Sequence, residues 1–271
     1  MASLTIAVAQ FAPVADGAVN LRTITAAAVA AAARGARLLV VPEYSAFFER
    51  DLGPRWVETA ETVDGPFVTG LAEAARASDI AIVAGMNERH VDAPDAVFWN
   101  TVVAILPDGT LAERYRKVHL YDAFGARESD WIEPGDPAQC PVFELDGVRL
   151  GIETCYDLRF PEVTRRLAVA GADVVLVPAE WVRGPGKEHH WRTLLTARAI
   201  EDTVYVVAAG QTPSVGIGCS VVIDPSGVTI AGLGAEPGLL TATVTTDEVE
   251  RVRSVNPSLS LRHYDVVERR P

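Results

Sequence analysis

The sequence places short, almost wholly apolar runs between longer segments of good helix formers. Such runs occur at 4–10, 38–42 and 80–86, and segments typical of helices lie between them at 20–33 and 66–77. A short apolar run without polar alternation is typical of a strand that is buried on both faces, as in a sheet covered by helices. This alternation predicts an α/β fold.

Three predicted hairpins interrupt the alternation. In each, a turn rich in Asp, Pro, Ser or Gly joins two strand-like runs, which predicts an antiparallel pair and therefore sheets of mixed direction. The paired runs are 101–106 with 111–118, 142–145 with 148–152, and 220–223 with 228–231. The other predicted elements are helices at 161–170 and 188–201, strands at 174–177, 204–208 and 239–244, and a charged tail from Asp247.

The chain shows no sign of internal division. No linker rich in Pro, Gly or Ser, no internal repeat and no low-complexity segment separates its parts, so we expect residues 1–271 to form one domain. Hydrophobic residues make up 49% and charged residues 22%, which excludes disordered and fibrous classes. No apolar stretch approaches the roughly 18 residues that span a bilayer.

The charge balance argues against nucleic acid and membranes as partners. The formal net charge is −12, and a strongly acidic chain repels phosphate backbones and anionic lipids. The N-terminus has no basic region before its first apolar run, so we predict no secretory signal. Cys140, Cys155 and Cys219 are odd in number and widely spaced. They indicate free thiols in a reducing compartment, and we expect a cytoplasmic protein.

Lysine is nearly absent from this chain. Of 24 Lys and Arg residues, only Lys117 and Lys187 are lysines. A lysine here can therefore indicate a position that needs a compact ammonium instead of a planar guanidinium. Lys117 directly follows Arg116 at the end of a predicted hairpin strand, where an arginine would have been easy to supply. The alternative is that lysine is simply infrequent.

Two chemically active side chains directly follow predicted strands. Glu43 comes after the run 38–42, and Cys155 comes after the strand 148–152. The carboxyl ends of strands carry function in α/β proteins, and partial burial suits a carboxylate to act as a base. A helix predicted to begin near Pro161 would favour a Cys155 thiolate if its N-terminus pointed there. The alternatives are a surface glutamate and a buried, inert cysteine.

The histidines do not predict a metal site. His189 and His190 are adjacent and would point about 100° apart on a helix, while His90 and His119 have no partner at ligand spacing. No glycine pattern has the strand-then-helix context of a nucleotide-binding loop. We therefore predict no metal and no cofactor. A dyad of Cys155 with a histidine, assembled in space, is an open alternative.

Three motifs in chain order resemble the nitrilase superfamily of carbon–nitrogen hydrolases, whose members use a Glu–Lys–Cys triad. Val41–Tyr44 is similar to the Glu motif, Tyr115–Asp122 to the Lys motif and Gly151–Glu162 to the Cys motif. Further similarity at 190–201 and 220–227 extends the resemblance over nearly the whole chain. Glu128, ahead of Pro134-Gly135, matches a second glutamate that many members carry.

The resemblance implies a fold and an assembly. It implies a four-layer αββα sandwich with mixed sheets, and a homodimer or higher homo-oligomer whose subunits pair through helices. The helix that contains Arg198 and Glu201 is a candidate face for this pairing. Because these two residues are three apart, they could pair within the helix or across the interface.

The resemblance also implies a role for each motif residue. Glu43 would take the proton of Cys155 and later activate water, and the Cys155 thiolate would attack the carbon of an amide or nitrile. Lys117 would hold the developing oxyanion, with the backbone N–H of Tyr156 as a second donor. Glu128 would position Lys117 or the substrate and carry no proton.

Within the superfamily, residues 155–162 are most similar to the Nit branch, which comprises ω-amidases and deaminated-glutathione amidases. The resemblance implies hydrolysis of a small amide, one that bears a carboxylate at its far end, through a thioester at Cys155. Arg159 is a candidate to bind that carboxylate, or else a structural ion-pair residue, and Trp181 is a candidate apolar wall. The alternatives are a nitrilase, an N-carbamoyl amidohydrolase and a catalytically silent binding partner.

Overall fold

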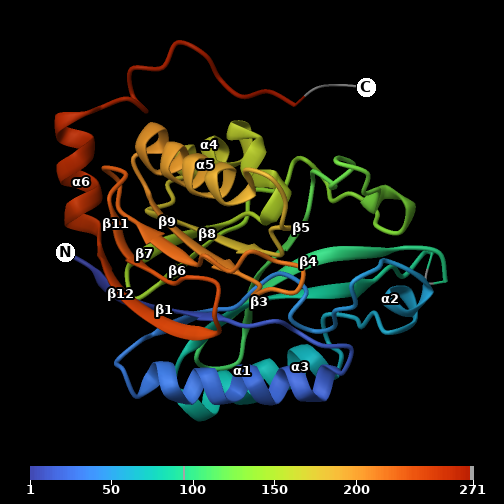
Figure 1. Cartoon of the computed structure of the whole chain (residues 1–271). Helices are drawn as coiled ribbons and strands as arrows, with labels where there is room; N and C mark the ends of the chain where they lie inside the picture. Colours follow the sequence, from blue (N-terminus) through green and yellow to red (C-terminus); the bar gives the residue numbers. More distant parts are fainter. Residues whose placement is uncertain (94, 269–271) are drawn as a thin grey trace.

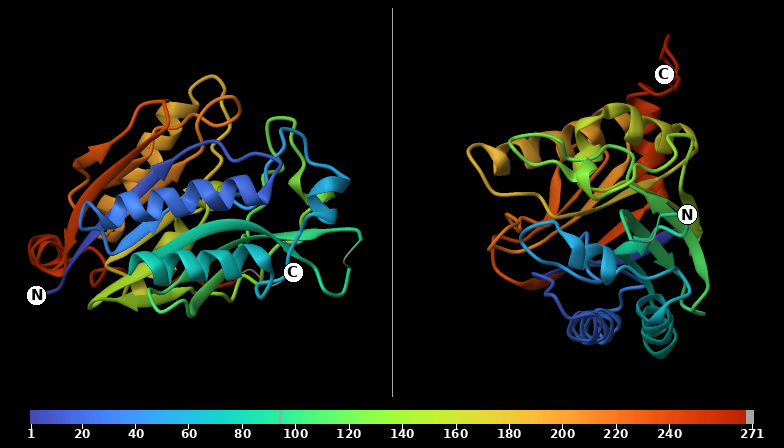
Figure 2. Two further views of the ribbon diagram at one scale, coloured as in Figure 1. Left: turned by 90° about the horizontal axis from the view of Figure 1, so that it is seen from below. Right: turned by 90° about the vertical axis from the view of Figure 1, so that its right-hand side faces the viewer.

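The computed structural model describes residues 1–93 and 95–268, and in this part of the chain two sheets lie face to face between two layers of helices (Figure 1). Helices α1 (Gly17–Ala32) and α3 (Pro66–Ser78) cover one sheet. Helices α4 (Pro161–Val169) and α5 (Lys187–Asp202) cover the other. Figure 2 shows α1 and α3 side by side in one layer. The predicted αββα sandwich is confirmed.

Each sheet has six described strands, with parallel pairing near its centre and antiparallel pairing at its edges. In sheet order, the first holds β12 (Gly238–Thr245), β1 (Ser3–Gln10), β2 (Leu38–Val40), β3 (Ala81–Arg89), β4 (Phe98–Ile105) and β5 (Leu111–Arg116). The second holds β11 (Thr229–Gly232), β10 (Val221–Ile223), β9 (Tyr205–Gly210), β8 (Val174–Ala179), β7 (Val148–Ile152) and β6 (Val142–Leu145). The predicted mixture of directions is confirmed.

Strand β1 shows why the runs carry no polar residues. Its Leu4, Ile6 and Val8 belong to the core between the two sheets, whereas Ala7 and Ala9 pack in the separate core beneath α1 and α3. Because successive side chains of a strand point to opposite faces, a strand in this architecture buries both sets. The apolar run is therefore the local signature of a strand between two layers.

The described helices differ from the predicted ones in two ways: one begins earlier than predicted, and several were not predicted. Helix α1 begins three residues before the predicted start, because the Asp16 side chain accepts hydrogen bonds from the N–H groups of Ala18 and Val19. Helix α6 (Thr246–Val255) lies where we predicted only a charged tail. Its Val249 and Val252 are buried, so tertiary packing stabilises it. The short elements are α2 (Pro54–Glu58), η1 (Glu128–Asp130) and η2 (Cys155–Arg159).

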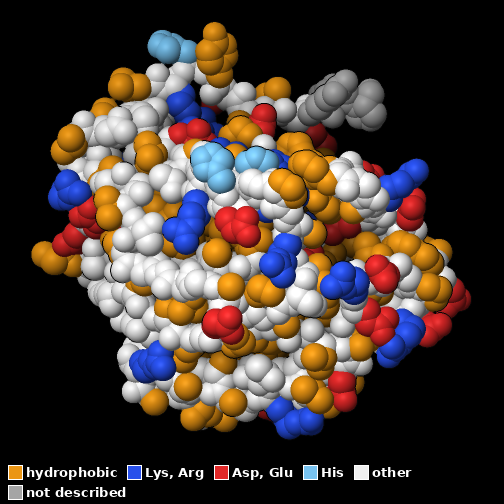
Figure 3. All heavy atoms as spheres, in the orientation of Figure 1, with side chains coloured by type: hydrophobic (Ala, Val, Ile, Leu, Met, Phe, Trp, Pro, Cys, Tyr) orange, Lys and Arg blue, Asp and Glu red, His pale blue; other side chains and the backbone are white. Residues whose placement is uncertain are grey.

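The outer surface carries charges of both signs. On the face shown in Figure 3, acidic and basic side chains are interspersed among apolar ones, without a continuous basic stripe on that face. Among the described residues, no helix has the length and apolar character needed to cross a membrane.

Candidate active site

Neighbouring strand ends from the two facing sheets bring the predicted residues together. Glu43 follows β2 of the first sheet, and Cys155 follows β7 of the second. Glu180 follows β8, which pairs with β7 in parallel. A hydrogen bond from the Glu180 N–H to Glu43 Oε2, 2.6 Å long, joins the two sheets at this point. The two residues that the strand-end argument selected therefore lie in one region of the molecule.

Lys117 lies between two carboxylates. Its Nζ is 3.1 Å from Glu43 Oε1 and 2.9 Å from Glu128 Oε2. All three side chains are buried, and Lys117 is only 1% exposed. Burial alone would lower the pKa of Lys117, but the charges of Glu128 and Glu43 outweigh burial and raise that pKa well above its usual range. Lys117 is therefore an ammonium held in a fixed position.

Further hydrogen bonds fix both carboxylates. Glu43 Oε1 also accepts from Asn100 Nδ2 at 2.6 Å. Glu128 Oε1 accepts from the Tyr44 hydroxyl at 3.0 Å, and Glu128 Oε2 accepts from the Tyr121 N–H at 2.7 Å. Each oxygen thus has at least one donor from the protein, which stabilises the charged form of a buried carboxylate.

Cys155 occupies a sharp turn at the end of its strand. It is the first residue of η2 and has a φ of 48°, a left-handed conformation that non-glycine residues rarely adopt. Its Sγ donates to the backbone carbonyl of Glu180 at 3.5 Å. Burial, followed by the negative charge of Glu43, raises the pKa of the Cys155 thiol well above its usual value.

This pKa corrects one expectation from the sequence. We expected that the helix beginning near Pro161 could favour the thiolate. Helix α4 does begin at Pro161, but the separate turn η2, whose first residue is Cys155, lies before it. Burial and Glu43 outweigh the opposing effect of Lys117 on the Cys155 pKa. The resting group is a neutral thiol, so its reaction requires a base that removes the proton.

Cys155 lines a small cavity that opens to solvent. The candidate residues Glu128, Tyr156, Arg159 and Trp181 also line it. Further lining residues, which we did not predict as site residues, are Tyr121, Glu180, Val182 and Lys187. The cavity therefore combines a thiol, aromatic walls and charged groups, and apolar walls with a few polar groups are typical of ligand sites.

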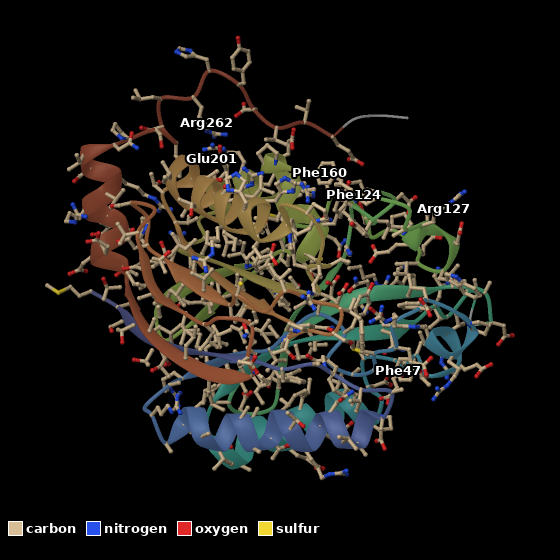
Figure 4. All side chains as sticks on the ribbon, in the orientation of Figure 1. Phe47, Phe124, Arg127, Phe160, Glu201 and Arg262 are labelled. Atoms are coloured by element: carbon tan, nitrogen blue, oxygen red, sulfur yellow. The ribbon has the colours of Figure 1, made fainter. Side chains whose placement is uncertain are left out.

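Arg159 and Lys187 bring positive charge to this cavity. Arg159 Cζ lies 4.8 Å from the ring centre of Trp181, and its buried Nε has no hydrogen-bond partner in the described structure. Lys187 Nζ donates to the Tyr121 hydroxyl at 2.7 Å and lies 3.9 Å from the ring centre of Phe124. Phe124 lies on the loop between β5 and η1 (Figure 4).

The structural role that we considered for Arg159 finds no support. Within the described residues, Arg159 forms no ion pair, and its polar side-chain contact is to His190 Nδ1 at 3.5 Å. Burial and the nearby positive charge of Arg159 lower the pKa of Lys187. Two cations near one cavity repel each other unless an anion lies between them.

The alternative of a Cys155–His dyad is also unsupported. No histidine is among the described residues that line the cavity. His119, from the Lys motif, has its Nδ1 2.8 Å from Asp157 Oδ1 and its ring stacked on Phe160. Among the described side chains, no group of three or more His, Cys, Asp or Glu residues could hold a metal ion.

Arg198 and Glu201 pair with each other within one helix. Arg198 Nη1 donates to Glu201 Oε1 at 2.6 Å, and Arg198 Nη2 donates to the Leu158 carbonyl at 2.7 Å. The hydrogen bond to Leu158 connects Arg198 to η2. Because Arg198 is only 4% exposed, it is not available to a partner subunit. Glu201 lies beneath the C-terminal segment that carries Arg262 (Figure 4).

The sequence contained signals for the unpredicted cavity residues. Glu180 directly follows a strand, as Glu43 does, and the strand-end argument would have included it. Lys187 is the second of the two lysines. Tyr121 belongs to the segment that resembles the Lys motif. Their convergence was not visible because η2, the start of α5 and the β5–η1 loop meet only in the folded chain.

Comparisons with known proteins agree with this geometry. Residues 5–254 match the family model described as carbon-nitrogen hydrolase. A relative from Escherichia coli O157:H7 named deaminated glutathione amidase is 38% identical over 261 residues, which cover 96% of this chain and 98% of the relative.

Two solved structures are similar over nearly all of this chain. The NitFhit protein of C. elegans has a TM-score of 0.89 at 30% identity, covering 97% of this chain and 66% of that one. A variant of the amidase from Nesterenkonia sp. AN1, with the acetamide moiety of fluoroacetamide covalently added at its active-site cysteine, has a TM-score of 0.81 at 29% identity, covering 97% and 94%.

These findings confirm the predicted superfamily and its Nit-like branch, and they confirm a thiol-dependent amidase as the type of enzyme. The roles of the individual site residues stay predictions. The chain belongs to the carbon–nitrogen hydrolase family.

Proposed function

We propose that Cys155, Glu43 and Lys117 form the catalytic triad of an amidase. Glu43 removes the thiol proton as Cys155 Sγ attacks the amide carbon, and the carbonyl oxygen becomes an oxyanion. The C–N bond then breaks, the amine leaves with the proton from Glu43, and a thioester remains on Cys155. Glu43 next takes a proton from water, which attacks the thioester, and the carboxylic acid product and the thiol are released.

Lys117 and the backbone N–H of Tyr156 are the proposed donors to the oxyanion. Preorganised donors around such an oxygen act strongly in a water-excluded site. Lys117 suits this role because it is buried and held by two carboxylates. Glu128 receives hydrogen bonds from Tyr44, Tyr121 and Lys117 at the same time, which supports a positioning role for it.

The proposed substrate is a small amide that carries a carboxylate. One observation carries this proposal: a cavity of small volume has the Cys155 thiol, Arg159 and Lys187 in its wall. The chain has a net charge of −12, so a free anion is repelled unless the pocket supplies local cations. Arg159 and Lys187 supply them, and Trp181 provides an apolar surface for the carbon chain between the two ends.

Deaminated glutathione and simple ω-amides are the first substrates to test. The relative from E. coli carries the name of the former activity. A wider groove of about 1,910 Å³, measured to the open solvent, shares Tyr121, Glu128, Glu180 and Lys187 with the small cavity. This groove has room for an amine leaving group larger than ammonia, which supports substituted amides as well as primary ones.

The test compares amides that differ in one charged end. Release of ammonia or amine is measured for ω-amides with a terminal carboxylate, for uncharged amides of equal length, for deaminated glutathione, for N-carbamoyl compounds and for aliphatic nitriles. We expect the carboxylate-bearing amides to have the highest kcat/KM. Faster turnover of nitriles or carbamoyl compounds than of every amide would contradict the proposal and favour those alternatives.

Two variants connect the substrate preference to the cavity. Arg159→Met removes one cation and is expected to raise KM for the carboxylate-bearing amide by about tenfold or more, because a charge-assisted hydrogen bond is lost. The uncharged amide keeps its KM. Arg192→Met, at an exposed position of α5, is the matched control. Equal effects on both amides would remove Arg159 from substrate binding.

Cys155→Ala tests the nucleophile itself. Because the change removes one small side chain, the fold is expected to persist while turnover is lost. With wild-type enzyme, hydroxylamine is expected to intercept the thioester as a hydroxamate. Turnover that persists in Cys155→Ala contradicts the triad, and an unreactive Cys155 would favour the catalytically silent binding partner.

The assembly and the location of the protein are also proposals. The resemblance to the Nit branch supports a homodimer or higher oligomer, the unpaired cysteines support a cytoplasmic location, and the core shared by both sheets supports one domain over 1–271. Light scattering at micromolar concentration tests the oligomer. A fully active monomer would contradict it.

A further inference from the structure

Glu180 is a buried carboxyl group in the cavity wall to which the proposed triad gives no role. It directly follows β8 and is only 9% exposed. Its main chain is fixed against the reacting groups, since its N–H donates to Glu43 Oε2 at 2.6 Å and its carbonyl accepts from Cys155 Sγ at 3.5 Å. Glu180 lines the same cavity as Cys155.

The other carboxylates near the thiol have no oxygen without a donor. Glu43 Oε1 accepts from Asn100 and Lys117, and Glu43 Oε2 accepts from the Glu180 N–H. Both oxygens of Glu128 accept from Lys117 and from a second donor. Glu180 differs, because its enclosed Oε1 has no hydrogen-bond partner in the described structure.

An enclosed acceptor without a donor is unfavourable in the free protein. Leaving such a group unsatisfied costs about 1–3 kcal/mol, and most buried polar atoms in native proteins have a partner. A ligand that brings a donor to this point recovers that energy. Glu180 and Cys155 line one cavity, and the Glu180 main chain accepts from Cys155 Sγ, so we place the donor on the part of the ligand that reacts.

The surroundings of Glu180 favour its neutral form. Burial, followed by the negative charges of Glu43 and Glu128, raises the pKa of Glu180 well above its usual value, against the opposing effects of Lys117 and Lys187. A neutral carboxyl still has a carbonyl oxygen that accepts hydrogen bonds. The neutral form also adds no further negative charge where Cys155 must become a thiolate.

We infer that Glu180 Oε1 accepts a hydrogen bond from the N–H of the scissile amide and that Glu180 thereby makes the site select amides over esters and nitriles. The inference rests on the proposed amidase function. Lys117 holds the carbonyl oxygen of the amide, and Glu180 holds its nitrogen. In the neutral group the proton lies on Oε2, and Oε1 acts only as an acceptor. The ester oxygen and the nitrile nitrogen carry no hydrogen, so those substrates leave Oε1 without a partner.

The test uses three substrates with one acyl group: a primary amide, its methyl ester and the corresponding nitrile. We expect Glu180→Leu to lower kcat/KM for the amide by about 10- to 100-fold. The ester should change by no more than about threefold, because it never used the acceptor. Glu180→Gln keeps a carbonyl oxygen and a similar shape, and it should restore most of the amide activity.

The control is Glu250→Leu, the same substitution at an exposed position of α6. A merely structural role of Glu180 would lower amide and ester turnover by equal factors, and that result overturns the inference. So does an unchanged amide-to-ester ratio in Glu180→Leu. A different result would contradict the proposed function itself, namely that the wild-type enzyme hydrolyses no amide.

Discussion

Two buried charged clusters differ in how completely their carboxylates are paired. The strand-end cluster (Glu43, Lys117 and Glu128) gives every carboxylate oxygen at least one donor and places an ammonium between the two acids. The helix-side cluster lies beneath α4 and α5 and comprises Glu153, Arg165, Arg198 and Asp202. Its acids, Glu153 and Asp202, are as deeply buried as those of the first cluster, but each has at least one oxygen without a hydrogen-bond donor in the described structure.

The helix-side cluster shows the result of that difference. Glu153 Oε2 accepts from the Thr164 hydroxyl at 2.7 Å, but Glu153 Oε1 has no partner in the described structure. Arg165 Nε lies 3.0 Å from Asp202 Oδ1, without a well-directed hydrogen bond to either Asp202 oxygen. Burial raises the pKa of Glu153 to about 8 and that of Asp202 to about 7.

Hydrogen bonds and a neighbouring ammonium favour the charged form of a buried acid, whereas burial without such partners favours the neutral form. The raised pKa values of Glu153 and Asp202 are examples of the second case. We therefore expect the strand-end cluster to supply charge for chemistry and the helix-side cluster to affect stability. The predictions below test this division, from the largest expected effect to the smallest.

Removing one charge at a time from the strand-end cluster should distinguish the catalytic roles of its two acids. Glu43→Gln is expected to lower kcat by about 10³-fold, because general acid–base catalysis contributes roughly 10²- to 10⁴-fold. Glu128→Gln is expected to lower it by about tenfold, because Glu128 only positions Lys117. Single-turnover kinetics with the best amide measures both. Equal losses would mean that Glu128 shares the proton transfer.

Lys117→Arg keeps the charge of the strand-end cluster but changes its shape. We expect kcat to fall by about 10²-fold, which is comparable to the loss of one oxyanion donor, since a planar guanidinium does not fit the compact space between two carboxylates and the thiol. Steady-state turnover measures the effect, and the control is Arg22→Lys, at an exposed position of α1. Full activity of the Lys117→Arg enzyme would contradict this reasoning.

Glu153→Gln should change stability in a pH-dependent way. The folded-state pKa of Glu153 is raised from 4.5 to about 8, so its neutral form stabilises the fold at low pH. That contribution is lost as the pH rises from about 4.5 to about 8, because the unfolded chain releases the proton first. The glutamine variant does not ionise and avoids this loss.

The measurement is thermal unfolding of both proteins across this pH range. We expect Glu153→Gln to melt a few degrees higher than wild type at pH 8.5 and at nearly the same temperature at pH 4.5, since about 1 kcal/mol corresponds to roughly 2–4 °C in a chain of this size. The activity of both proteins at pH 7 is measured separately. A stabilisation that is the same at both pH values would show that folding does not raise the Glu153 pKa.

Much of the candidate site could be predicted because its signals are local. Glu43 directly follows one apolar run and Cys155 comes shortly after another, and such runs are visible in the sequence. Lys117 was conspicuous because the chain has one other lysine. Glu128, Tyr156, Arg159 and Trp181 followed from the resemblance or from sequence proximity, and all four line the cavity.

Other features could not be predicted from local signals. Helix α6 was missed because its apolar residues are few, and its stability comes from burying Val249 against the core between the sheets. The pairing of Arg198 within its own helix was one of two equal possibilities by spacing alone. The neutral thiol of Cys155 depends on how deeply the fold buries it, which no pattern of neighbouring residues encodes.

The sequence by itself therefore determined the alternation of strands and helices, the mixed strand directions and the residues that follow the strands, because hydrophobic periodicity and turn chemistry act over a few residues. Only the tertiary structure decided which of those residues meet and in which protonation state. Glu180 shows the reason: its chemistry depends on burial and on the carboxylates of Glu43 and Glu128, which reach it from the facing sheet and a distant turn and not from its neighbours in the chain.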